Sequence, residues 1–207
     1  MSQTAAAEHI VETAETPLTP ESWGKTGMWL FLAGDAMSFG TLLAGYAIIR
    51  SVSTNWPLPS EVLGIGLTAF MTFLLICSSL SMVTALDAIK QRDAKKFKLY
   101  MLLTIGGGII FLGLQAYEWN HLIHEGLRPF SSPYGTPLFG ATFFTLTGLH
   151  MTHVAIGVVY LVVIAFGFGA GKYDAEDVEV SGLYWHFVDL VWMFVFPMVY
   201  LLSTKVG

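Results

Sequence analysis

Five long apolar segments limit the folds that this sequence can adopt. They cover residues 26–49, 61–86, 98–119, 138–169 and 183–203. Each is long enough to cross the hydrocarbon core of a bilayer as a helix, which needs about 20 mostly apolar residues. Only helices and closed barrels satisfy all of their backbone hydrogen bonds inside lipid. We therefore predict an all-α, polytopic membrane protein with five transmembrane helices.

The composition agrees with a membrane protein and disfavours a soluble helical one. Hydrophobic residues make up 54% of the 207 residues and charged residues only 12%, with a mean hydropathy of +0.62. A soluble protein of this size could not bury five uniformly apolar helices in its core. Residues 1–24 differ, because they are rich in Ala, Thr and Glu, and we predict a mobile acidic tail before a membrane domain over residues 25–207.

Basic residues predict the orientation of the helices. Segment 90–98, between the second and third spans, contains five of the ten Lys and Arg residues. That side of the membrane collects seven in total, and the opposite side has only Arg50, Arg128 and Lys205. Because Lys and Arg are concentrated in cytoplasmic loops, we predict a cytoplasmic N-terminus and an external C-terminus. No stretch is basic enough to suggest nucleic-acid binding.

Asp35 lies near the middle of the first apolar segment. Ionisable groups are costly at bilayer depth, so this residue is a candidate functional site. Three interpretations are open. Asp35 is a neutral acid bonded to Ser38 or to a backbone carbonyl, an ionised partner of a buried histidine, or a group that faces another subunit on a proton path.

Small residues predict close helix contacts in two spans. Ala36, Gly40 and Ala44 recur at intervals of four in the first span, and Gly106–Gly108 and Gly113 lie in the third. Such spacing allows two helix backbones to approach closely.

Pro197 in the last span removes a backbone hydrogen bond and predicts a kink there. Trp185 and Trp192 are seven residues apart and share a helix face. We expect Trp185 at the cytoplasmic interface, where tryptophan is enriched.

Glu118 and His121 have the Glu-x-x-His spacing of di-iron carboxylate bundles. A complete site of that kind needs a second such pair and two more inward-facing glutamates. The sequence offers neither at that depth, so a di-iron site is disfavoured.

Two further polar pairs lie in the fourth and fifth spans. His150 and His153 are three residues apart, so they can share a metal, ligate a haem, or bond a neighbouring helix or lipid. No other ligand is visibly paired with them, which favours a structural role. His186 and Asp189 can also meet on one helix face. A proton-relay fragment remains open there, but an interhelical clamp or a head-group anchor is favoured.

Four sequence segments resemble subunit III of the haem-copper oxidases. They are WLFLAGD at 29–35, FLGLQAYEW at 111–119, FFTLTGLHMTHVAIG at 143–157 and YWHFVDLVW at 184–192. They occur in the family's order and are spread over four of the five spans. The resemblance covers nearly the whole chain after residue 24 and implies a five-helix prokaryotic member of a family that often has seven helices.

The resemblance also implies a function. In this family subunit III binds no haem or copper, which belong to partner subunits. It packs against catalytic subunit I, accompanies subunit II and other respiratory chains, retains phospholipids and supports proton uptake. Asp35 falls where the family has a buried acid, commonly Glu, that reacts with carbodiimides. The other family polar positions, expected to stabilise the bundle or its lipids, are Glu118, His150, His153, His186 and Asp189.

We therefore expect a non-catalytic subunit of a respiratory terminal oxidase in a prokaryotic plasma membrane. Cytochrome c is the favoured electron donor, and a quinol oxidase is the alternative. A small proton-coupled transporter with Asp35 as the proton carrier is more distant, because the sequence has no inverted repeat.

Overall fold

The fold was analysed in a computed structural model that describes residues 23–202. Residues 1–22 of the predicted tail and residues 203–207 lie outside this range, and Trp23 and Gly24 already belong to the first helix. The elements are α1 (Trp23–Val52), α2 (Pro59–Val62), α3 (Ile65–Lys90), α4 (Ala94–His124), α5 (Pro137–Gly169), α6 (Ala175–Phe196) and the π-helical segment η1 (Pro197–Leu201). Five of the helices are long and apolar enough to cross a membrane, so the predicted five-span helical fold is confirmed for the described residues.

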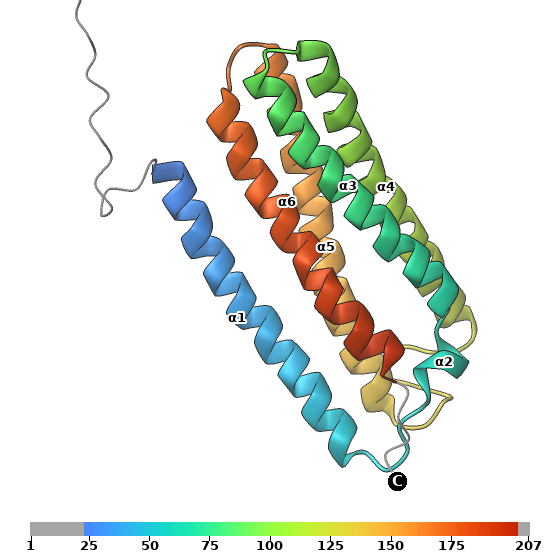
Figure 1. Cartoon of the computed structure of the whole chain (residues 1–207). Coiled ribbons are helices and arrows are strands. Elements are labelled where there is room, and N and C mark those ends of the chain that lie inside the picture. The colour runs from blue at the N-terminus through green and yellow to red at the C-terminus, as the bar shows by residue number, and fades with distance from the viewer. Residues whose placement is uncertain (1–22, 203–207) are drawn as a thin grey trace, which may run out of the picture.

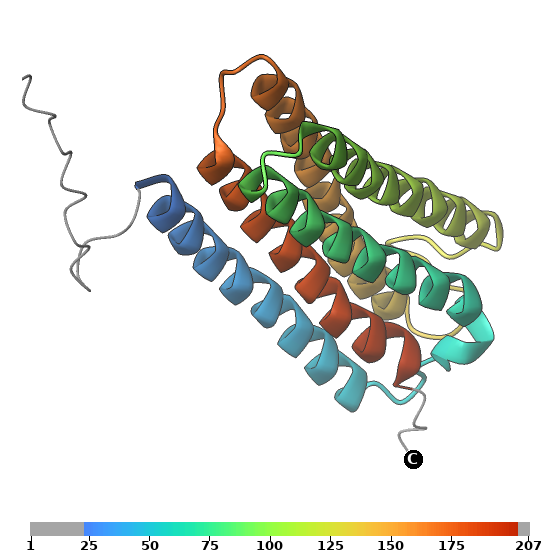
Figure 2. The same ribbon diagram turned by 45° about the horizontal axis from the view of Figure 1, so that its top comes forward.

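Four of the long helices form a closed bundle, and α1 lies on its flank. Helix α3 contacts α4 and α6, and α5 contacts the same two helices. Helix α1 packs mainly against α6 and α5, and both views show it at the flank of the bundle beside α6 (Figure 1, Figure 2). In its most apolar window 17% of the α1 residues are buried, compared with 50% for α6. Helix α1 is therefore a peripheral helix with a large outward face.

The second span begins later than the sequence predicts. Pro59 starts the short helix α2, and the extended backbone at Leu63 separates this helix from α3. Helix α3 then begins at Ile65. Proline is well suited to the first turn of a helix because it has no N–H group to leave unpaired.

The last span begins earlier than predicted, at Ala175. Asp174 caps it, because its side chain accepts hydrogen bonds from the backbone N–H groups of Glu176 (2.9 Å) and Asp177 (3.2 Å). Trp185 consequently lies ten residues inside the helix and is only 1% exposed. The expected interfacial position of Trp185 is wrong. Its indole N–H instead donates to the Ser78 hydroxyl of α3 at 3.1 Å.

The helix changes its hydrogen-bond pattern at Pro197. The N–H group of Leu202 donates to the carbonyl of Pro197 at 3.0 Å, five residues back. The predicted disruption at this proline thus takes the form of a π-helical segment, and such segments often occur at functional sites. This segment places Tyr200 fully inside the bundle.

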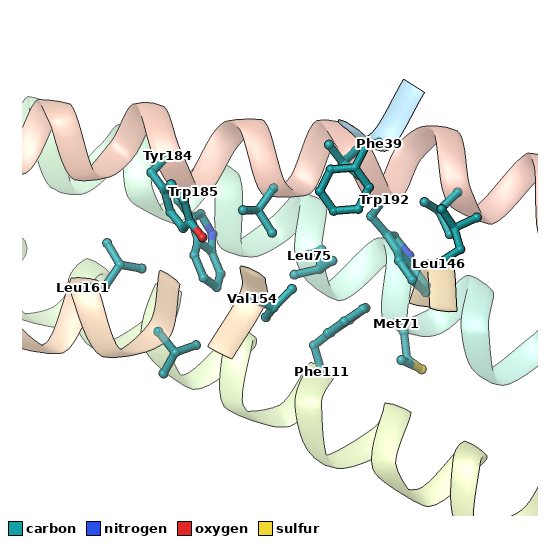
Figure 3. Packing of buried hydrophobic residues seen from close by; sticks show 14 of the residues in the cluster. Phe39, Met71, Leu75, Phe111, Leu146, Val154, Leu161, Tyr184, Trp185 and Trp192 are labelled. Carbon is teal, nitrogen blue, oxygen red and sulfur yellow. The ribbon is translucent and has the colours of Figure 1, made fainter. Parts of the chain in front are cut away.

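Aromatic side chains fill the centre of the bundle (Figure 3). Phe111 of α4 meets the ring of Trp192 edge-on at 4.9 Å and 87°. The Trp192 indole N–H donates to the Thr72 hydroxyl of α3 at 2.9 Å. Edge-to-face pairs of this kind are favoured because the ring edge is positive and the ring face is negative.

Two of the third-span glycines allow close helix packing. A Cβ atom on Gly107 would lie 2.8 Å from Cβ of Ser78 in α3, and one on Gly108 would lie 2.5 Å from the Trp185 ring in α6. The predicted close contacts are therefore confirmed at these two positions.

The other small residues face outward. A Cβ atom on Gly106 or Gly113 of α4, or on Gly40 of α1, would meet no neighbour within 4 Å among the described residues. Ala36 and Ala44 are exposed as well. The small residues of α1 therefore form no close helix contact within the described part of this chain.

We predict that Gly108→Ala lowers the stability of the bundle, because the buried Trp185 ring is hydrogen-bonded and has no room to shift. Overpacking of this kind typically costs about 1–3 kcal/mol. Gly113→Ala is the matched control, because it adds the same methyl group at an open position and improves helix propensity by about 1 kcal/mol. Thermal unfolding in detergent should rank Gly113→Ala at or above the wild type and Gly108→Ala below it. Equal unfolding temperatures for the two variants would contradict this packing.

Candidate functional site

Polar contacts attach α1 to the bundle at both of its ends. Near its beginning, Lys25 Nζ lies 2.8 Å from Glu179 Oε1 near the start of α6. Near its end, the Arg50 guanidinium donates to the backbone carbonyl of Leu202, just after η1. Because the two contacts occur in the same order along α1 and α6, these helices run parallel.

Asp35 provides a third attachment at the middle of α1. Its Oδ2 atom lies 3.1 Å from Nε2 of His153 in α5. The other ring nitrogen, Nδ1, lies 2.8 Å from the Leu149 carbonyl. The structure thus places a histidine beside Asp35, as one of the three interpretations requires. Ser38 does not bond Asp35, since its hydroxyl donates to the Gly34 carbonyl at 3.2 Å.

The Leu149 carbonyl decides where one imidazole proton lies. A carbonyl only accepts hydrogen bonds, so Nδ1 of His153 must carry a hydrogen. Nε2 then either accepts from a neutral Asp35 or, when protonated, donates to its carboxylate. In either form the hydrogen bond joins α1 to α5.

His150 lies one turn before His153 but has a different environment. It is fully buried, stacks on Trp192 at 4.8 Å, and meets Phe111 edge-on at 5.8 Å. Neither ring nitrogen has a hydrogen-bond partner among the described residues. The structure therefore does not bring the two histidines together as a pair of ligands.

Glu118 has the most complete hydrogen-bond network of the candidate residues. It is 3% exposed. Its Oε2 accepts from the Gln115 amide at 2.8 Å and from the Tyr200 hydroxyl at 2.9 Å, and its Oε1 lies 3.1 Å from the Thr68 hydroxyl. The network thus joins α3, α4 and η1. Sequence reasoning singled out Glu118 but missed Thr68 and Tyr200, which lie 50 and 82 residues away along the chain.

His121 does not share a site with Glu118. Its side chain is 64% exposed, and Nε2 lies 3.3 Å from Glu125 Oε1 on the same helix face. Between residues 23 and 202, no group of three or more His, Cys, Asp or Glu side chains is arranged to hold a metal ion.

His186 contributes to the contact between α6 and α3, because its Nδ1 lies 2.6 Å from the hydroxyl oxygen of Ser79. Asp189 lies one turn further along α6, and its buried Oδ1 has no hydrogen-bond partner among the described residues. The contact of His186 agrees with the favoured interpretation of an interhelical clamp. Ser79 was not identified from the sequence, because a short group of serines in an apolar span does not show which of them meets a histidine of another helix.

Comparison with known proteins identifies relatives along nearly the whole chain. Residues 15–204 match the family model described as cytochrome c oxidase subunit III. Cytochrome c oxidase subunit 3 of Bacillus sp. (strain PS3) is 37% identical over 92% of this chain and 95% of its own length. Quinol oxidase subunit 3 of Bacillus spizizenii is 33% identical over 86% of each chain.

We predict that Asp35→Leu destabilises the protein because it leaves Nε2 of His153 without a partner. A buried polar group left without a hydrogen-bond partner costs about 1–3 kcal/mol, and the His153 side chain is only 13% exposed. Asp35→Asn is the matched control, because its amide N–H can donate to the same nitrogen and keeps the contact. Thermal unfolding in detergent should therefore place Asp35→Asn close to the wild type and Asp35→Leu clearly below it. The reverse order would show that the hydrogen bond to His153 does not stabilise α1.

Proposed function

Since the chain belongs to the cytochrome c oxidase subunit III family, and therefore to a multi-subunit membrane oxidase, we propose that it is a non-catalytic subunit that stabilises the catalytic subunit and supports its proton uptake. The complex would reduce oxygen to water and move protons across a prokaryotic plasma membrane. Cytochrome c is the proposed electron donor, in keeping with relatives that bear that name. Relatives named as quinol oxidases make a quinol the alternative.

The outward face of α1 is the observation that best supports packing against a partner subunit. Gly34 and Gly40 have open space where a side chain would be, and Ala36, Thr41 and Ala44 are exposed beside them. Helices associate in lipid through close backbone packing at small residues, since lipid tails are as apolar as leucine. This surface therefore suits a helix of catalytic subunit I, with subunit II and further chains in the same complex.

The histidines support the proposal that haem and copper belong to the partner subunits. His150 is enclosed by the rings of Phe111 and Trp192, which leaves no space for a macrocycle at its nitrogens. His153 is bonded at both nitrogens, to Asp35 and to the Leu149 carbonyl. Neither residue fits an axial haem ligand in this arrangement.

A groove between α4 and α5 supports retention of a phospholipid. It has a volume of about 560 Å³ and is lined mainly by apolar side chains, including Met101, Ile105 and Phe166. Lys98 lies at the same groove, near the start of α4. An acyl chain would lie along the apolar wall, and the ammonium group would attract a lipid phosphate.

We predict that the purified chain alone shows no haem absorbance and consumes no oxygen. When it is isolated gently from native membranes through an affinity tag, it should bring a haem-containing catalytic subunit with it. Absorption spectroscopy and mass spectrometry of the intact complex check both points, and the companion subunits also identify the electron donor. A stoichiometric haem spectrum from the chain alone would overturn the proposed role.

We predict that Asp35→Ala leaves the initial oxidase turnover largely unchanged but alters the lifetime of the complex during turnover. The reason is that Asp35 positions α1 through His153 and takes no part in oxygen chemistry. Ser38→Ala is the control, because its hydroxyl bonds only its own helix. Oxygen uptake followed until inactivation measures both quantities. Complete loss of turnover in a fully assembled Asp35→Ala complex would contradict this role.

A further inference from the structure

A crevice opens at the end of the bundle where α4 ends and α3 begins. Its lining includes Glu61, Leu67, His121, Glu125 and Tyr134, and its volume is about 290 Å³. A water molecule occupies about 30 Å³ in the liquid, so the crevice has room for several. Glu61, His121 and Glu125 are exposed, which makes the mouth polar and open to solvent.

Glu118 also lines this crevice, although its side chain belongs to the buried network. The groups that face the carboxyl are all neutral hydrogen-bond donors, namely Thr68 on α3, Gln115 on α4 and Tyr200 on η1. None of its hydrogen-bond partners among the described residues is a Lys or Arg. The buried acid is therefore next to an aqueous crevice and has no cation to fix its charge.

We propose that Glu118 is a proton-binding site that exchanges protons with the aqueous phase through this crevice. In one direction a hydronium ion in the crevice transfers its proton to a carboxylate oxygen, which leaves water and a neutral carboxyl group. In the other direction the carboxyl group returns the proton to water. The titratable groups that line this path are Glu61 of α2, Tyr117 and His121 of α4, Glu125 directly after α4, and Tyr134, whose hydroxyl donates to Glu125 at 3.2 Å.

Both charge states of Glu118 have suitable partners. The carboxylate accepts the three hydrogen bonds already described. The neutral acid must donate one hydrogen bond. The Thr68 hydroxyl can accept it from Oε1, because the single hydrogen of this hydroxyl can be donated to the Gly64 carbonyl at 3.1 Å instead. Gain of a proton at Glu118 thus requires only a change in the direction of the Thr68 hydrogen bond.

Infrared spectroscopy of the whole membrane complex tests the proposal. As the pH is varied, the wild type should show a carboxylic-acid band that appears and disappears and that is absent from Glu118→Gln. Glu125→Gln is the matched control, because it removes an exposed carboxylate at the crevice mouth and should retain the band. A spectrum with no Glu118-dependent band that changes with pH would overturn the proposal.

Two further variants extend the test. One applies if Glu118→Gln does not assemble, and the other tests whether protons reach Glu118 through the crevice. If Glu118→Gln does not assemble, Glu118→Asp serves instead, because it keeps a carboxyl group at this position. It should shift the carbonyl frequency of the band that changes with pH. An unshifted band would overturn the assignment of the band to Glu118. Leu67→Trp narrows the crevice but keeps Glu118, so the band should remain while its exchange with deuterated water slows several-fold. Unchanged exchange in this variant would exclude the crevice as the route.

Discussion

Polar contacts between helices determine this structure, because apolar burial does not draw helices together inside lipid. The Trp185 indole fixes α6 to the Ser78 hydroxyl of α3, and Asp35 fixes α1 to His153 of α5. Glycines allow the approach that these contacts need, as at Gly108 against α6. The bundle is thus specified by a few donors and acceptors at places where the backbones come close, and the apolar surface mainly provides compatibility with the bilayer.

Asp35 and Glu118 are stabilised away from water in different ways. Asp35 has one side-chain partner among the described residues, His153, which can either donate to its carboxylate or accept from its neutral acid. Glu118 has three neutral donors and no cation, so its own charge changes when it gains or loses a proton. Several hydrogen bonds are what allow a charged group to persist away from water. Asp35 is therefore suited to hold a helix, and Glu118 is suited to respond to its surroundings.

The sequence predicted those features that depend on local rules. Span length follows from bilayer thickness, and Asp35 stood out because an ionisable residue at bilayer depth is rare. Thr68 and Tyr200 were missed because Glu118 reaches them only through folding, across 50 and 82 residues. The start of α6 was placed too late because its first turn contains Glu176 and Asp177, which resemble a loop by hydropathy. Acidic residues are favourable in a first turn, since they complement the positive end of the helix dipole.

The peripheral position of α1 has a consequence for its central acid. Among the described residues α1 packs mainly against α5 and α6, and its opposite face has small residues with open space above them. The Asp35 side chain is 20% exposed. It lies between its partner His153 on the inner side and the outward face of α1. In the proposed complex a partner helix that covers α1 would also cover Asp35 and lower the local dielectric. A hydrogen bond strengthens in such surroundings, whereas an unpaired acid would be penalised. The pair between Asp35 and His153 would therefore allow an ionisable residue to lie at the surface where α1 would meet the catalytic subunit, and it would make the attachment of α1 firmer in the proposed complex.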